Sequence, residues 1–126
     1  MSGKILVDTS VFIDFFRGKY IKELELAIKE DRVVLSQIVL LELIKGIIKT
    51  EIKKVVSFLD GLEILPDFPP AVACQELLIK AKSLGLQGGI PDLLILSDCY
   101  VNQIQLLSSD LKLVRLARAL KIRVQG

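Results

Sequence analysis

Four acidic residues occupy positions that a fold built on a parallel sheet brings together. Asp8 directly follows the apolar run ILV, and Asp110 follows the run QLLSS near the other end of the sequence. Glu42 interrupts the apolar segment VLLELIKG, and Asp92 follows Pro91 at the start of a helical pattern. In open α/β sheets, ligands bind outside the carboxyl ends of the strands. We therefore expect these four carboxylates, from four separate segments, to converge on one crevice.

Carboxylates gathered in this way point to one kind of chemistry. Like charges at close range are unfavourable, and Mg²⁺ or Mn²⁺, which prefers oxygen ligands, relieves the repulsion. Such an ion generates hydroxide from bound water and stabilises charge on a phosphoryl oxygen. The sequence contains no His, which excludes histidine triads and two-histidine metal centres. The pattern therefore favours hydrolysis of phosphodiesters with a divalent cation.

Each acid also has a purely structural interpretation. The three aspartates of the set lie at expected helix N-termini, where a carboxylate caps free N–H groups and complements the helix dipole. Glu42 can instead pair with Lys45 or Lys49 on its own helix. Surface or capping positions are expected for Asp14, Asp60, Asp67 and Asp98.

Short apolar runs alternate with segments of helical period along the chain. This alternation predicts an α/β fold, a three-layer α/β/α arrangement with a central parallel sheet of about five strands. Strands are expected at residues 5–7, 33–35, 62–65, 105–107 and 122–124. Helices are expected at residues 10–16, 21–29, 37–49, 52–59, 70–84, 91–102 and 111–120. Without a linker or an internal repeat, residues 1–126 are expected to form a single domain.

Composition excludes several classes of protein. The 126 residues are 52% hydrophobic and 25% charged, which is typical of a globular domain and not of a disordered chain. The formal net charge of +2 is too small to indicate a nucleic-acid partner by itself. No signal peptide and no membrane span are visible in the sequence. Cys74 and Cys99 are expected to be small buried side chains in a reducing cytoplasm.

Four blocks of sequence occur in one order along nearly the whole chain: LVDTSVFIDFF, SQIVLLELIKG, GIPDLLIL and LLSSDLKLVRLA. Together they resemble the PIN domain, specifically the small VapC-type ribonuclease toxins. The resemblance implies an endoribonuclease that depends on Mg²⁺ or Mn²⁺ and acts on RNA such as tRNA, rRNA or mRNA. It also implies the toxin of a toxin-antitoxin pair, a cytoplasmic homodimer that is inhibited by a cognate antitoxin.

The family's four acids match Asp8, Glu42, Asp92 and Asp110, which the resemblance makes both catalytic residues and ligands of the metal ion. The family often has a further acid two residues after the fourth. This chain has Lys112 at that position, and the departure weakens the case for a second tightly held metal ion.

Other polar positions receive supporting roles. The small hydroxyl positions of the family match Thr9 or Ser10 and Ser108, for which the resemblance implies a role in ordering the acids and a bound water. Contacts to RNA would come from basic residues on helices near the acids, each of which fits a solvated surface charge equally well: Arg17, Lys45, Lys49, Lys112 and Arg115. Such contacts position a phosphate backbone without specifying its sequence.

A second interpretation stays open beside the enzyme. A catalytically inactive PIN-like module, in which the acids only cap helices or the protein binds RNA or another protein, fits the same residues. Metal binding, and dependence of activity on Asp92, separate the two interpretations. Phe12, Phe15 and Phe16 cluster beside Asp8, where a subunit interface, an antitoxin groove or ordinary core packing would bury them.

Overall fold

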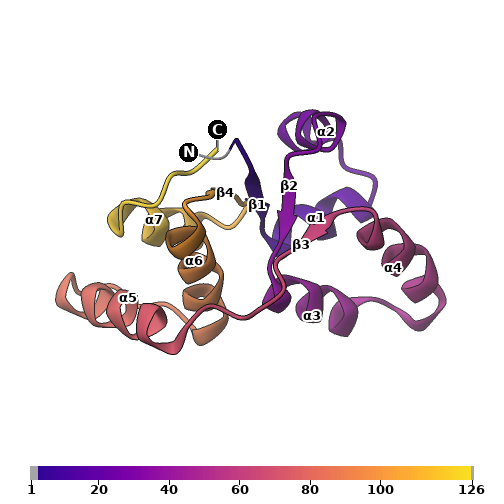
Figure 1. The fold of residues 1–126 in the computed structure, drawn as a ribbon. Helices are drawn as coiled ribbons and strands as arrows, with labels where there is room; N and C mark the ends of the chain where they lie inside the picture. The colour runs from indigo at the N-terminus through magenta and orange to yellow at the C-terminus, as the bar shows by residue number, and fades with distance from the viewer. Residues whose placement is uncertain (1–2, 126) are drawn as a thin grey trace.

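The computed structural model describes residues 3–125, and its central element is a parallel sheet of four strands in the order β3-β2-β1-β4 (Figure 1). Parallel pairing sets Ile5 beside both Val33 and Gln105. The strands are β1 (Ile5–Val7), β2 (Val33–Leu35), β3 (Glu63–Ile64) and β4 (Gln105–Leu107). The segment expected as a fifth strand makes a single parallel bridge, between Leu106 and Val124.

Helices cover the sheet, as the alternating pattern predicted. Among the described residues, β1 and β2 are buried along their whole length, as expected of strands with helices on both sides. The α-helices are α1 (Thr9–Phe16), α2 (Lys22–Lys29), α3 (Gln37–Gly46), α4 (Ile52–Asp60), α5 (Ala71–Ser83), α6 (Ile90–Asn102) and α7 (Leu111–Ala119). The three-layer α/β/α prediction is confirmed, with four strands in place of about five.

The helices fall into two groups around the sheet. Figure 1 shows α5, α6 and α7 on the side of β4, and α1 to α4 on the side of β2 and β3. The groups meet where α3 packs against α6, and within them α1 packs against α3 and α5 against α6. The core contains the fully buried side chains of Leu6, Phe12, Val34, Leu96 and Leu106.

One helix ends earlier than its pattern predicted. The helical period runs from residue 37 to 49, but α3 stops at Gly46, and a 3₁₀ turn (Lys49–Glu51) precedes α4. Ile47 and Ile48 between them have extended backbones, with ψ of 142° and 147°. Apolar spacing alone cannot show this break, because Ile47 still packs against the core from its extended position.

No helix within residues 3–125 is both long enough and apolar enough to cross a membrane.

Candidate active site

Asp8 stands at the carboxyl end of β1, where its backbone and side chain are both held. Its N–H donates to the carbonyl of Leu107 on the neighbouring strand β4, at 2.9 Å. The hydroxyls of Ser10 and Ser108 each donate to its Oδ2 atom at 2.8 Å. The residue is 5% exposed and precedes α1 without a side-chain capping hydrogen bond. Two hydroxyls from opposite ends of the sequence therefore fix the orientation of this buried carboxylate.

Glu42 is oriented by the first turn of α1. The Thr9 hydroxyl donates to its Oε1 atom at 2.8 Å, across the contact between α1 and α3. The side chain is half-buried, on the second turn of α3. Within residues 3–125, Glu42 makes no ion pair with Lys45 or Lys49. The alternative of a helix-surface ion pair is therefore not supported, and Thr9 and Ser10 serve different acids.

Asp110 caps a helix and belongs to the same hydroxyl network. Its Oδ1 atom accepts hydrogen bonds from the backbone N–H groups of Lys112, at 2.9 Å, and Leu113, at 3.3 Å. Its own N–H donates to the Ser108 hydroxyl at 3.0 Å, and that hydroxyl in turn donates to Asp8. The capping interpretation is correct for Asp110, and it fixes the acid close to Asp8.

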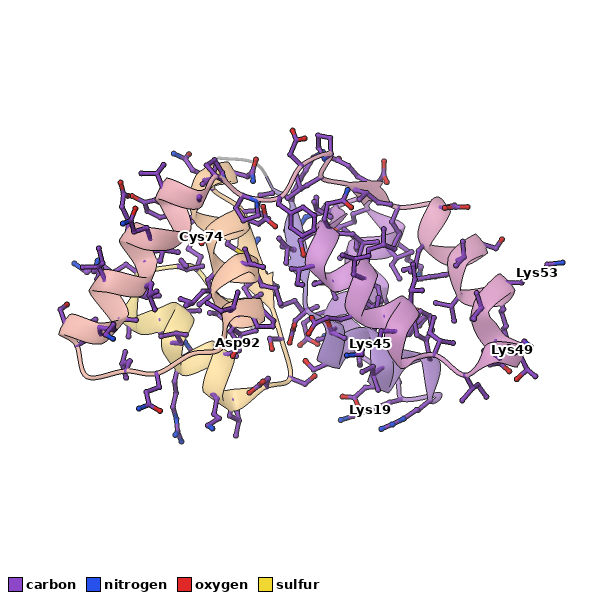
Figure 2. All side chains as sticks on the ribbon, turned by 90° about the horizontal axis from the view of Figure 1, so that it is seen from below. Lys19, Lys45, Lys49, Lys53, Cys74 and Asp92 are labelled. Carbon is purple, nitrogen blue, oxygen red and sulfur yellow. The ribbon has the colours of Figure 1, made fainter. Side chains whose placement is uncertain are left out.

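Asp92 joins the set from the first turn of α6, which begins one residue before Pro91. Burial raises the pKa of Asp92 above its usual value, and the negative charges of Asp110, Asp8 and Glu42 raise it further, in that order. Lys112 lowers the pKa of the same carboxyl. Figure 2 shows Asp92 beside a group of side-chain oxygens between α6 and α3. The fold therefore brings the four acids into one electrostatic neighbourhood.

The four acids are of the type that binds a divalent cation, although in the described part of the chain their side chains are not arranged around one. Within residues 3–125, no group of three or more His, Cys, Asp and Glu side chains is arranged to hold a metal ion as it stands. All four side chains nevertheless offer hard carboxylate oxygens, the donors that Mg²⁺ and Mn²⁺ take. The negative charges of Asp110, Asp8 and Glu42 raise the pKa of Asp92, and a bound cation would relieve this repulsion. The donor set therefore fits such an ion.

Comparison with known proteins places this arrangement in a family. A family model of the PIN domain matches residues 5–119. The chain belongs to the PIN domain family. This match confirms the resemblance carried by the four sequence blocks. A search of curated proteins found no match.

Solved structures share the fold of this PIN domain over nearly their full length. DNA-bound VapBC from Salmonella typhimurium matches with a TM-score of 0.83 at 23% identity, over 97% of this chain and 96% of that chain. VapBC2 from Rickettsia felis, bound to a DNA fragment from the promoter, matches with a TM-score of 0.77 at 26% identity, over 96% of each chain. VapBC-1 from nontypeable Haemophilus influenzae matches with a TM-score of 0.77 at 18% identity, over 97% of this chain and 96% of that chain.

The basic residues expected to contact RNA lie at different distances from the acids of this PIN domain. Figure 2 shows Lys45 and Asp92 on either side of the group of oxygens, whereas Lys49 lies at the outer edge of the molecule near Lys53. The side chains of all five basic residues are exposed: Arg17, Lys45, Lys49, Lys112 and Arg115.

An apolar groove adjoins the acids on the side of α1. It is lined by α1, α3 and α4 and the turn between the last two, and has a volume of about 470 Å³. Phe15 and Phe16 from α1 and Phe58 from α4 form its aromatic part, with ring centroids 5.5 to 5.7 Å apart. Glu42 and Arg17 also line it. The groove thus runs from aromatic side chains to one of the four acids. Phe12, in contrast, belongs to the core.

A fifth acid, Asp98, departs from its expected position. The prediction of a surface or capping role is wrong, because Asp98 is 2% exposed. α6 packs against α5, α3 and β4, so more than one of its faces is buried. Among the described residues, Asp98 Oδ2 and Ser97 Oγ have no hydrogen-bond partner. Burial raises the pKa of Asp98 to about 7. The sequence did carry a signal of this burial, because Asp98 interrupts the apolar helical pattern of residues 91–102.

The cysteines differ in environment. Cys99 is buried, as expected, whereas Cys74 is half-buried, and both are free thiols. Burial raises the pKa of the Cys99 thiol, and the nearby charges of Asp98 and Asp8 add to this effect. A thiol in this state is a poor nucleophile, which fits the expectation of a packing role.

Proposed function

We propose that this PIN domain is a metal-dependent endoribonuclease that hydrolyses RNA phosphodiester bonds. The observation that carries the proposal is the convergence on Asp92 of the charges of Asp8, Glu42 and Asp110. These acids come from four segments of the chain, and packing them together without a counter-ion costs stability. Such a cost is typical of a functional site.

Each side chain of the cluster has a role in the proposed reaction. Asp8, Glu42, Asp92 and Asp110 would hold Mg²⁺ or Mn²⁺, which supplies a water-derived nucleophile and stabilises charge on the phosphoryl oxygens. Ser10 and Ser108 keep Asp8 in one orientation through its Oδ2 atom, which leaves Oδ1 for the ion. Thr9 does the same for Glu42 through Oε1.

We also propose that the protein is the toxin of a toxin-antitoxin pair. The structures that it resembles include VapBC chains and a toxin-antitoxin complex from Klebsiella pneumoniae, the latter with a TM-score of 0.66 at 20% identity. In this proposal, an apolar segment of the antitoxin lies in the groove between α1, α3 and α4, whose aromatic side chains offer it contact area. Because the groove reaches Glu42, a bound segment would also restrict access to the acids. The two free cysteines fit a reducing compartment such as the cytoplasm.

A homodimer completes the proposal. Val72 and Ile79 are 61% and 60% exposed, and their spacing of seven residues places them on one face of α5. A second copy of the chain would remove these apolar side chains from water. Sedimentation of the purified protein tests this part, and a monomer at all concentrations would contradict it.

The test of the activity is cleavage of mixed total RNA by purified protein with Mg²⁺ or Mn²⁺. We expect cleavage that EDTA abolishes and that Asp92→Asn reduces by at least about a hundredfold, since the substitution removes one charged ligand. Asp67→Asn is the matched control, because Asp67 is exposed and lies outside the cluster.

The outcomes separate the enzyme from the alternative. Cleavage that survives both EDTA and Asp92→Asn would identify a contaminating ribonuclease and remove the support for the proposal. A folded protein that neither binds Mn²⁺ nor cleaves any RNA would instead be an inactive binding module.

A further inference from the structure

A second cavity lies beside Asp92 and shares no lining residue with the apolar groove. It is lined by the end of α5, the 84–89 loop, the start of α6 and the first turns of α7, it is open to solvent on one side, and its volume is about 640 Å³. Pockets of about 300 to 1,000 Å³ are typical of sites for small molecules. Asp92 forms part of its wall, so the cavity is continuous with the candidate active site.

The charged wall of the cavity suits a phosphate group. Lys82 from α5 and Lys112 from α7 both line it. Within residues 3–125, neither lysine makes an ion pair, and both side chains are exposed. Lys112 also acts electrostatically on Asp92, which places its positive charge close to the acids. An anionic ligand between these two lysines would therefore extend directly toward the carboxylate cluster.

The remaining wall of the cavity is apolar. Leu78, Leu86 and Leu116 line it. Leu78 and Leu86 also pack against the core, which holds their side chains in place. The 84–89 loop lies tightly on α7, since a Cβ atom added at Gly88 would stand 2.6 Å from Leu116 Cδ2. The flat ring face of a nucleobase gains contact with such a surface when it leaves water.

We propose that this cavity is a nucleotide subsite, which takes the nucleotide next to the bond that is cut. The phosphate of that nucleotide lies between Lys82 and Lys112, and its base lies on Leu78, Leu86 and Leu116. The inference rests on the proposed ribonuclease function and adds to it a second place where single-stranded RNA is held. It also assigns a role to Lys82, which lies on α5, an element that carries none of the four acids.

Binding of RNA to the whole protein tests the proposal without relying on cleavage. The probe is a fluorescein-labelled single-stranded RNA oligonucleotide, and its anisotropy is measured over a range of salt concentrations with Ca²⁺ as the divalent ion. We expect Lys82→Ala to weaken binding about five- to tenfold and to lower the slope of log K against log salt by about 0.7, the share of one phosphate contact on a single strand. Lys82→Arg keeps the contact and is expected to restore both values.

Lys80→Ala is the matched control, because Lys80 is also an exposed lysine of α5 and does not line the cavity. If Lys82→Ala and Lys80→Ala bind RNA with the same affinity and the same salt slope, the subsite is wrong. The same oligonucleotide with abasic sites in place of its central bases is expected to bind wild-type protein at least about threefold more weakly. Equal binding of the abasic oligonucleotide would overturn the placement of the base.

A second assay separates a failure of the proposed subsite from a failure of the proposed ribonuclease activity. Hydrolysis of bis(p-nitrophenyl) phosphate by wild-type protein with Mn²⁺ reports on the acids without any nucleotide. If wild-type protein hydrolyses neither this diester nor RNA, the proposed activity fails, whereas the comparison of Lys82→Ala with Lys80→Ala still decides the binding site.

Discussion

Replacing Asp98 with asparagine is predicted to stabilise the protein, and to do so more strongly at higher pH. Asp98 is 2% exposed, its Oδ2 atom has no partner among the described residues, and burial raises its pKa from 3.8 to about 7. An acid with a raised pKa in the folded state binds its proton more tightly there than in the unfolded chain. The folded state therefore loses stability as the pH rises from the unfolded pKa to the folded one.

The size of the effect follows from the shift in pKa. A rise of about three units corresponds to about 4 kcal/mol between the protonated and ionised forms. Below about pH 4, Asp98 is protonated in both states, and Asp98→Asn should change the free energy of unfolding little. The stabilisation should then grow by about 1.4 kcal/mol per pH unit and level off above about pH 7.

Urea unfolding of both proteins at about pH 4, 5.5, 7 and 8 measures this difference directly. Asp67→Asn removes an exposed charge and should give no comparable dependence on pH. A constant difference between wild type and Asp98→Asn over the whole range would refute the reasoning. It would mean that Asp98 is not an isolated acid desolvated by the core.

Two further predictions concern the hydrogen bonds that hold the acids. Thr9→Val keeps the shape of the side chain but removes the hydroxyl that donates to Glu42, so we expect RNA cleavage to fall about tenfold while the melting temperature changes little. Ser83→Ala, which removes an exposed hydroxyl that bonds to a backbone carbonyl on α5, should leave cleavage as it is. Asp110→Ala removes the cap of α7 and is expected to cost about 1 kcal/mol, measured by urea unfolding, whereas Asp110→Asn retains most of the cap. Both Asp110 variants should lose most of the cleavage activity, and an active Asp110→Asn would show that this acid only caps the helix.

Much of the fold could be predicted because its signals are local. The continuous apolar runs of β1 and β2, each buried on both faces, could be recognised from a few residues. The rule that strand ends carry the ligand site then placed Asp8 and Asp110 together, although they lie about 100 positions apart. Hydrogen bonds from Ser108 to Asp8 and from Asp110 to Ser108 show how the structure realises this placement.

The parts that could not be predicted depend on tertiary packing. The helical spacing of residues 37–49 continues past Gly46, yet Ile47 reaches the core from an extended backbone, so the pattern does not reveal the end of α3. The burial of Asp98 depends on how many neighbours α6 has, which the sequence of α6 alone does not show. Lys49 lies at the outer edge of the molecule for the same reason, because α3 ends at Gly46 and the chain then turns away toward α4.

The most direct test of the central claim is a titration of the protein with Mn²⁺, in which the electron paramagnetic resonance signal of the free ion is followed. If Asp8, Glu42, Asp92 and Asp110 form a divalent metal site, wild-type protein and Asp67→Asn should bind Mn²⁺ with equal affinity. Asp92→Asn should bind at least about tenfold more weakly. Equal Mn²⁺ affinity of the wild-type and Asp92→Asn proteins would contradict the claim that these acids hold the ion.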